Sequence, residues 1–467
     1  MPQAIYLSDD IRRIEQANPD LPLMERAGAA AAELAASLLS DKGKDVLVLA
    51  GPGNNGGDAG IVARILREKF FRVSVAGKPE EIPKDTRWNL VVDGLFGIGL
   101  ARPVEGEYAK LVDYANAQAC PVLALDIPSG LQSDTGQVLG KAVRATRTLT
   151  FIGLKPGLLM LDGPDHCGQV TVADLSLKGN GAAQGWIAEP ALFANILKPR
   201  PGNFHKGMAG SLGIIGGVPG MEGAALLAGR AALRLGAGRV YVGMLDEGPQ
   251  FDAAVPELMF RHADEVLGLD LDAIVIGPGL GQGERAETLL GAVLASDLPC
   301  VIDADALNLI AANADLRNSC ARRSADTLLT PHPAEAGRLL AETTAQVQAD
   351  RLKAARVLSA NLNAHVVLKG NGSALIARDG HWFINASGNP GMASAGMGDV
   401  LSGILGALLA QKYSGEAALV LGTHLHGCAA DECVRSGAGP VGLTAGELID
   451  PARRIWNRWL AGMTGPA

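Results

Sequence analysis

Residues 385–404, NASGNPGMASAGMGDVLSGI, decide how the second half of this chain is interpreted. Small residues precede Asp399 and an apolar run follows it, which predicts a helix whose N-terminus carries free backbone amides. Such an N-terminus attracts phosphate through its amides and its dipole. Asp399 at its rim could accept a proton from a hydroxyl that attacks the phosphate. The alternative is a glycine-rich connector with an ordinary capping Asp, so other parts of the sequence are needed to choose.

Length and composition indicate a soluble protein with more than one core. The chain has 467 residues, of which 48% are hydrophobic, so two or more domains are expected. A net charge of -8 argues against a general nucleic-acid or membrane-surface binder. Six cysteines form no CxxC pair, and we find neither a secretory leader nor a membrane-spanning apolar run. We therefore expect a cytoplasmic protein.

The first polar cluster follows the predicted strand 45–50, in the segment GPGNNGGDAG. Three of its glycines fit a dinucleotide-binding pattern, but the acidic residue expected after the next strand is missing. Asn54, Asn55 and Asp58 lie in a glycine frame where a strand passes into a helix. Three clustered side-chain oxygens favour a site for a ribose, an amide or a monovalent cation over a purely structural turn.

Two further strands of the first half end in polar residues. LVVDGLFGIGLARP places Asp93 at the end of one strand, before a glycine-rich loop, and VLALDIPSGL places Asp126 and Ser129 after another. Each Asp alone could cap a helix or form a turn. Because the carboxyl ends of parallel strands line one crevice, the three clusters together predict a ligand site.

The second half repeats a strand, loop and helix pattern through SLGIIGG, LDAIVIGPGLG and PCVIDADALNLI. This pattern predicts a mainly parallel sheet with helices on both faces. Proline, glycine and lysine cluster at 198–206, where we predict a solvated linker between domains 1–200 and 206–467. The fold class is therefore α/β with two domains. Asp303, which follows a strand, could reach a metal or a hydroxyl or could cap the next helix, and we favour the cap.

Two motifs of the second half have both a structural and a functional interpretation. His332 lies between two prolines in TPHPAE. It could be a structural histidine or could contact the substrate. KGNGS, which begins at Lys369, could be a hairpin turn or could hold the phosphate or adenosine part of a nucleotide. GxxxxGK[ST] does not occur in the sequence, which excludes a P-loop as the source of nucleotide chemistry.

GPGNNGGDAG, VVDGLFGIGLARPVEG and LDIPSG, in this order, resemble the epimerase domain of the NAD(P)H-hydrate repair enzymes, a Rossmann-like three-layer domain. The resemblance implies that the hydrated dinucleotide contacts Asn54, Asn55, Gly56, Gly57, Asp58, Gly97, Ile98, Gly99, Leu100, Ala101, Arg102, Pro103 and Asp126. It implies a catalytic role for Asp126 at the nicotinamide end. It also implies a potassium ion bound by Asn55, Asp93 and Ser129.

GSLGIIGG, IGPGLG, TPHPAE, KGNGS and GNPGMASAGMGD resemble the ADP-dependent NAD(P)H-hydrate dehydratase domain, which is ribokinase-like. The resemblance implies substrate contacts at Ala224, Gly279, Gly281, His332 and Asp399, the last of them catalytic. It implies a nucleotide site formed by Lys369, Gly370, Asn371, Gly372, Ser373 and Gly398. Ala59 and Ala334 depart from the pattern of the family, which usually has glycine at both positions.

The two resemblances cover nearly the whole chain in the order of the fused bacterial enzyme. They imply a bifunctional enzyme that epimerises hydrated NADH or NADPH with the help of K⁺. It would then dehydrate the S form with ADP and Mg²⁺, giving AMP and phosphate. The alternative is a ribokinase-like small-molecule kinase fused to a non-catalytic α/β binding domain, which would release a stable phosphoester. We expect a homo-oligomer that binds neither nucleic acid nor membrane.

Overall fold

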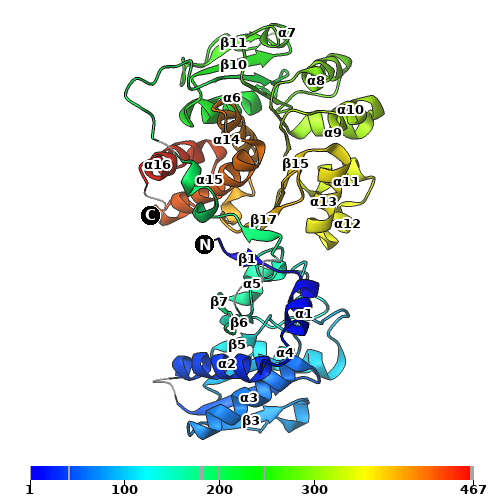
Figure 1. The fold of residues 1–467 in the computed structure, drawn as a ribbon, viewed down its shortest axis with the longest axis vertical. Helices are drawn as coiled ribbons and strands as arrows, with labels where there is room; N and C mark the ends of the chain where they lie inside the picture. Colours follow the sequence, from blue (N-terminus) through cyan, green and yellow to red (C-terminus); the bar gives the residue numbers. More distant parts are fainter. Residues whose placement is uncertain (1, 40–42, 178–182, 198, 247, 463–467) are drawn as a thin grey trace. The chain divides into compact units, whose positions relative to one another are not determined.

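A computed structural model describes residues 2–39, 43–177, 183–197, 199–246 and 248–462 (Figure 1). The chain forms two compact units. One comprises Gln3–Trp186, and the other comprises Ile187–Ala467 together with Met1–Pro2. Both are α/β units in which most neighbouring strands are parallel, as the sequence predicts. Within the described ranges, no helix is both long and apolar enough to cross a membrane.

The first unit has a parallel sheet with strand order β3-β2-β4-β5-β6-β7. The strands are β2 (Asp45–Ala50), β3 (Arg72–Ala76), β4 (Leu90–Gly94), β5 (Val122–Leu125), β6 (Arg147–Phe151) and β7 (Gln169–Ala173). The helices are α1 (Ser8–Gln16), α2 (Leu23–Leu39), α3 (Asn54–Glu68), α4 (Gly106–Asn116) and α5 (Gly163–Cys167). Near the ends of the unit, β1 (Ala4–Ile5) pairs antiparallel with β8 (Gly185–Ile187).

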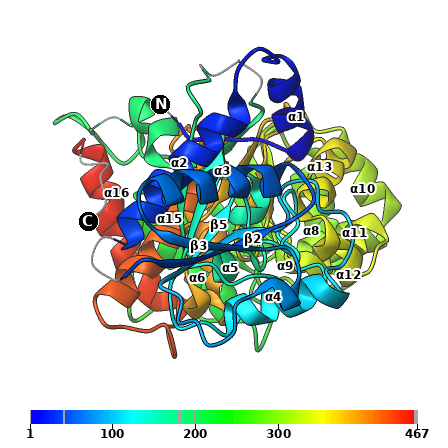
Figure 2. The same cartoon turned by 90° about the horizontal axis from the view of Figure 1, so that it is seen from below.

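Alternate side chains of the central strand β2 point to opposite faces of this sheet and form two cores. Val46 and Val48 pack with α2 and α3, whereas Leu47 and Leu49 pack with α4. Figure 2 shows α2 and α3 on one side of the strands and α4 on the other. The unit is thus three-layered, and the loops after β2, β4 and β5 leave the sheet at the same edge, because these strands are parallel.

The second unit has a sheet that runs in the order β17-β16-β15-β14-β13-β12-β9-β10-β11. Its strands are β9 (Ser211–Ile215), β10 (Arg239–Met244), β11 (Met259–His262), β12 (Ala273–Ile276), β13 (Cys300–Ile302), β14 (Thr327–Leu329), β15 (His365–Leu368), β16 (Ser373–Ile376) and β17 (Trp382–Asn385). Strands β16 and β17 are antiparallel to their neighbours, and the pairs from β15 to β11 are parallel. The expectation of a mainly parallel sheet is confirmed.

Helices of the second unit surround this sheet. They are α6 (Glu222–Arg234), α7 (Ala263–Val266), α8 (Glu284–Ala295), α9 (Ala304–Ala312), α10 (Ala314–Ala321), α11 (Pro333–Leu340), α12 (Thr344–Ala349), α13 (Arg351–Leu362), α14 (Met397–Ala410), α15 (Gly415–Arg435) and α16 (Ile449–Leu460). The predicted apolar helix is α14, and it is buried from Val400 to its end. A Cβ at Gly403 would lie 2.1 Å from the Ala228 carbonyl oxygen, so α14 and α6 pack backbone against backbone.

The chain joins the second unit earlier than the predicted linker. The Ala188 amide donates to the Ile384 carbonyl oxygen of β17, at 2.9 Å. Within the predicted linker, Arg200 donates to the carbonyl oxygen of Gly236 at 2.6 Å and lies over the Phe204 ring. Residues 199–203, 205 and 206 are exposed, so the segment is solvated, but Arg200 has its partner on the second unit and the division between the units lies earlier, at Trp186/Ile187. Lys198 lies outside the described residues.

Candidate active sites

The predicted cation ligands of the first unit follow β2, β4 and β5, and Asn55 and Ser129 both lie within hydrogen-bond distance of the Phe96 carbonyl oxygen. The Ser129 hydroxyl donates to Asp93 at 2.7 Å, and the Ser129 amide donates to the other oxygen of the same carboxylate at 2.8 Å. The Asn55 side-chain amide donates to the Phe96 carbonyl oxygen at 3.0 Å, which leaves Asn55 Oδ1 buried without a partner. Burial raises the pKa of Asp93 to about 6. An unpaired buried oxygen beside a buried carboxylate suits a bound cation.

Asp126, at the end of β5, forms a buried ion pair. Its backbone has a φ of 62°, which non-glycine residues seldom adopt and which holds the carboxylate at the sheet edge. Lys155 Nζ lies 2.5 Å from Asp126 Oδ1, and it also donates to Thr150 Oγ1 and to the Phe151 carbonyl oxygen, both at 2.8 Å. The sequence analysis missed Lys155, although it closely follows strand β6 and therefore belongs to the same edge.

The glycine-rich loop 97–103 begins against these groups. A Cβ at Gly97 would lie 3.3 Å from Asp126 Oδ2 and 3.5 Å from Asn55 Cβ, so the loop covers both side chains. Asp58 is buried beside them, and burial together with the charges of Asp126 and Glu15 raises its pKa to about 7. Glu15 of α1 therefore belongs to this site and was not predicted. Residues 101–103 of the loop are exposed.

The second site is formed where α14 begins beside strand β15. The Val400 amide donates to the Gly396 carbonyl oxygen, so the amides before it have no acceptor within the helix. A Cβ at Gly398 would lie 3.2 Å from Lys369 Nζ, which brings the lysine ammonium to this helix N-terminus. Burial and the charge of Asp303 raise the pKa of Asp399 to about 7.

The interpretation of Asp303 as a helix cap is wrong. Asp303 occupies the N-cap position of α9, but its side chain makes no capping hydrogen bond. Instead Lys369 Nζ donates to one carboxylate oxygen at 3.1 Å, and the Ser402 hydroxyl donates to the other at 2.8 Å. The buried carboxylate thus accepts hydrogen bonds from Lys369, at the end of β15, and from Ser402 of α14, and it links these two elements.

KGNGS is a hairpin turn, because β15 and β16 pair antiparallel on either side of it. Ser373 closes the turn by donating from its hydroxyl to the Gly370 carbonyl oxygen at 3.1 Å. The structural interpretation is thus confirmed. Lys369, at the start of the turn, lies at the second site, and nucleotide binding by the turn stays a prediction.

His332 caps helix α11. Its Nδ1 accepts from the amides of Ala334 and Glu335, at 3.1 and 3.3 Å, and the Glu335 carboxylate accepts from the His332 amide. Burial and the nearby Lys369 lower the pKa of His332. Because Nδ1 accepts, the neutral ring carries its proton on Nε2, and this atom lies 3.3 Å from Glu335 Oε1. Both ring nitrogens thus have partners on α11, which confirms the structural interpretation, and contact of the half-exposed ring with a substrate stays a prediction.

The remaining predicted substrate contacts lie between α6 and the loop after β12. A Cβ at Gly279 would lie 3.4 Å from Ala224 Cβ, so the two positions adjoin. The Gly281 amide donates to Asp305 at 2.9 Å. Asp305 thus fixes the loop, and the structure places Ala224 and Gly279 side by side.

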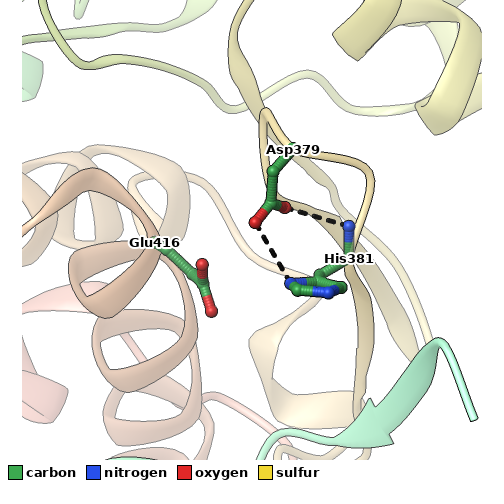
Figure 3. A group of neighbouring side chains, drawn as sticks. All are labelled: Asp379, His381 and Glu416. Carbon is green, nitrogen blue, oxygen red and sulfur yellow. Dashed lines mark hydrogen bonds and ion pairs between the residues drawn. The ribbon is translucent and has the colours of Figure 1, made fainter.

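A separate group of possible metal ligands lies at the turn between β16 and β17, at the other end of β16 from KGNGS. Ligand atoms of Asp379, His381 and Glu416 lie within 4.8 Å of one another (Figure 3). Asp379 already pairs with the His381 ring at 3.1 Å, and both side chains are about half exposed. We assign no metal to this exposed ion pair.

Comparison with solved structures covers the second unit. The crystal structure of the ADP/ATP-dependent NAD(P)H-hydrate dehydratase from Bacillus subtilis, co-crystallised with ATP/Mg²⁺, is 30% identical, with a TM-score of 0.52. The match covers 58% of this chain and 98% of that chain. A ribokinase-like superfamily protein from Enterococcus faecalis is 24% identical, also with a TM-score of 0.52, and covers 61% of this chain and 99% of its own. The expected ribokinase-like fold is confirmed.

Comparison with known sequences covers both units. Residues 212–451 match the family described as NAD(P)H-hydrate dehydratase, and residues 20–90 and 80–157 match the YjeF-related protein N-terminus. The bifunctional NAD(P)H-hydrate repair enzyme Nnr of Escherichia coli K12 is 38% identical over 98% of this chain and 95% of its own length. The enzyme of the same name from Coxiella burnetii is 36% identical over 97% and 99%. The chain therefore belongs to the family of bifunctional NAD(P)H-hydrate repair enzymes.

Proposed function

We propose that the chain repairs NADH and NADPH that have been hydrated at C6 of the reduced nicotinamide ring. The first unit interconverts the R and S epimers, and the second dehydrates the S epimer at the expense of ADP. The observation that carries the second activity is Asp399, which lies in the first turn of α14 next to Lys369 and has a pKa of about 7. A carboxylate with this pKa is matched to proton transfer near neutral pH.

In the second unit, Asp399 takes the proton of the 6-hydroxyl as that oxygen attacks the β-phosphoryl group of ADP. The amides at the start of α14 and the ammonium of Lys369 stabilise the charge on the transferring group. AMP leaves, and C6 then carries a phosphate, which is a better leaving group than hydroxide. Loss of this phosphate from C6 and of a proton from C5 restores the ring double bond. Mg²⁺, when bound with ADP, supplies further charge compensation for the phosphates.

In the first unit, Asp126 and Lys155 are the groups that could hold or move a proton at the nicotinamide ring. The Asp126 carboxylate lies beside Gly97, the first residue of the loop 97–103, and we propose that this loop covers the ring. Asn55, Asp93 and Ser129 would hold K⁺, whose charge would compensate the buried carboxylate and fix the two loops. The support for this site is the orphaned Asn55 Oδ1.

The potassium site predicts an effect on stability that does not depend on activity. Replacing choline by K⁺ at constant ionic strength should raise the unfolding temperature, with about 2.7 kcal/mol of stabilisation at a hundredfold excess over the dissociation constant. Calorimetric melting of the whole chain measures this shift. The Asn55→Ala variant should melt at one temperature in both salts. An equal K⁺ shift in this variant would remove Asn55 from the ligand set.

Asp399 predicts the pH dependence of dehydration. A base must be ionised to act, and the pKa of this carboxyl is raised to about 7, so kcat/KM for the S epimer should fall about tenfold per pH unit below that pH. Stopped assays between mildly acidic and mildly alkaline pH measure this limb. An Asp with an ordinary pKa would give a flat profile across the same range, and that result would contradict the role of Asp399 as base.

The alternative kinase function predicts a different product. A repair enzyme given hydrated NADH, ADP and Mg²⁺ should release AMP and inorganic phosphate in equal amounts, and no phosphorylated dinucleotide should accumulate. Phosphorus NMR of the mixture distinguishes the two, because a kinase would leave a stable phosphoester resonance.

We also propose that the enzyme acts in the cytoplasm as a homo-oligomer. Light scattering measures the oligomeric state.

A further inference from the structure

The first residue of α13, Arg351, is buried beneath the turn 369–373. Only 1% of its surface is exposed. Its guanidinium donates from Nη1 to the Asn371 carbonyl oxygen at 2.6 Å and from Nη2 to the Leu368 carbonyl oxygen at 3.1 Å. These two carbonyls flank Lys369 and Gly370, so one planar group fixes both sides of the turn.

Gly370 is matched to this guanidinium. Its φ is +149°, and a Cβ at this position would lie 2.7 Å from Arg351 Nη2. Any larger residue would push either the turn or the arginine out of place. The backbone of the turn therefore rests directly on the charged group, with no side chain between them.

The charge of Arg351 has no carboxylate partner among the described residues. Burial alone lowers its pKa to about 10, with no contribution from a neighbouring charge, and Nε is buried without a hydrogen bond. Buried charges are usually paired. Even Arg230, whose side chain is one-third exposed, donates to both oxygens of Asp252, whereas Arg351 donates to backbone carbonyls alone. An unpaired buried guanidinium is costly to the folded protein, and an anion bound at the turn would offset that cost.

We propose that Arg351 is a positioning residue of the nucleotide site. It holds the carbonyls of the turn so that Lys369 and the turn amides face the phosphates of ADP, and its own charge is balanced only when those phosphates bind. The inference rests on the proposed function, because it takes the turn 369–373 as the nucleotide site. Arg351 itself touches neither nucleotide nor reacting atoms.

Arg351→Met and Arg351→Lys test this role in the full-length protein. ADP affinity is measured by calorimetry, and the KM for ADP is measured separately from kcat and from the KM for hydrated NADH. We expect Arg351→Met to weaken ADP binding and raise its KM on the order of tenfold or more. Arg351→Lys keeps the charge but cannot donate to both carbonyls as the guanidinium does, so its ADP affinity should lie between those of the wild type and Arg351→Met. Epimerisation and the KM for hydrated NADH should stay unchanged.

Arg323→Met is a matched control. Arg323 is a second buried arginine that donates to backbone carbonyls, in this case those of Val293, Leu294, Ser296 and Leu298. Its loss should lower the unfolding temperature without changing the KM for ADP. If Arg351→Met does not fold, the ADP affinities of Arg351→Lys and Gly370→Ala test the inference. Gly370→Ala keeps the arginine in the chain but moves its guanidinium away from the turn.

Three outcomes are distinguishable. A selective rise in the Kd and KM for ADP supports the inference. Wild-type ADP affinity in the folded Arg351 variants, or equal effects of the Arg323 and Arg351 variants on the KM for ADP, overturns it. Failure of the wild-type protein to bind ADP overturns the proposed function itself, whatever the Arg351 variants do.

Discussion

An Asp399→Asn variant is expected to dehydrate the S epimer about 10²- to 10⁴-fold more slowly than the wild type, while it still interconverts the epimers. Asparagine keeps the size of the side chain and cannot take the proton of the attacking hydroxyl. The backbone amides of α14 and Lys369 remain, so nucleotide binding should persist. Rates of NADH recovery from the purified S epimer, together with the affinity for ADP, measure this separation of chemistry from binding.

Asp450→Asn is the matched control for this variant. Asp450 lies in the first turn of α16, as Asp399 does in α14, but its side chain is 57% exposed. It should therefore leave dehydration unchanged. Wild-type dehydration by Asp399→Asn would show that another group takes the proton, and would leave Asp399 as a structural residue.

An Asp126→Asn variant is expected to lose epimerisation by about 10²- to 10⁴-fold, because the carboxylate beside Lys155 is removed from the ring site. Dehydration of the S epimer in the second unit should continue. Given a mixture of epimers with ADP and Mg²⁺, this variant should therefore recover NADH only from the S share, and then stop. Chromatography of the residual hydrate should find the R epimer alone.

Loss of the carboxylate also leaves Lys155 buried with its ammonium poorly compensated, which costs about 3–5 kcal/mol in comparable pairs. Melting of the variant therefore accompanies the assay, and the rate is compared well below the unfolding temperature. Asp165→Asn, which changes an exposed carboxylate of the same unit, should leave both rates unchanged. Wild-type epimerisation by a folded Asp126→Asn protein would remove Asp126 from the chemistry.

Much of the layout of both sites was predictable from local sequence. Strands that end in GPGNNGGDAG, in Asp93 and in Asp126 belong to one parallel sheet, so their polar ends had to meet at one edge. The helix after GMGD was equally predictable, because an unbroken apolar run follows the small residues. Both predictions rest on short-range patterns and on a general rule for parallel sheets.

Side chains that support the sites from a distance were not predictable. Asp303 and Ser402 are 99 residues apart, and only folding brings the buried carboxylate to α14. Lys155, Glu15 and Arg351 likewise have meaning only through partners on other elements. The pKa of Asp399 depends on burial and on Asp303, neither of which a local motif encodes. Periodicity and motifs therefore locate the first contacts of a site and miss the groups that tune it.

The central claim is tested most directly by incubating the wild-type chain with acid-hydrated NADH, ADP and Mg²⁺. Acid-hydrated NADH contains both epimers. The near-ultraviolet absorbance of the reduced nicotinamide reports recovered NADH. Repair by both units predicts complete recovery of the hydrate, with one AMP and one phosphate for each NADH. Absence of recovery, or a stable phosphorylated hydrate in place of NADH, would contradict the claim.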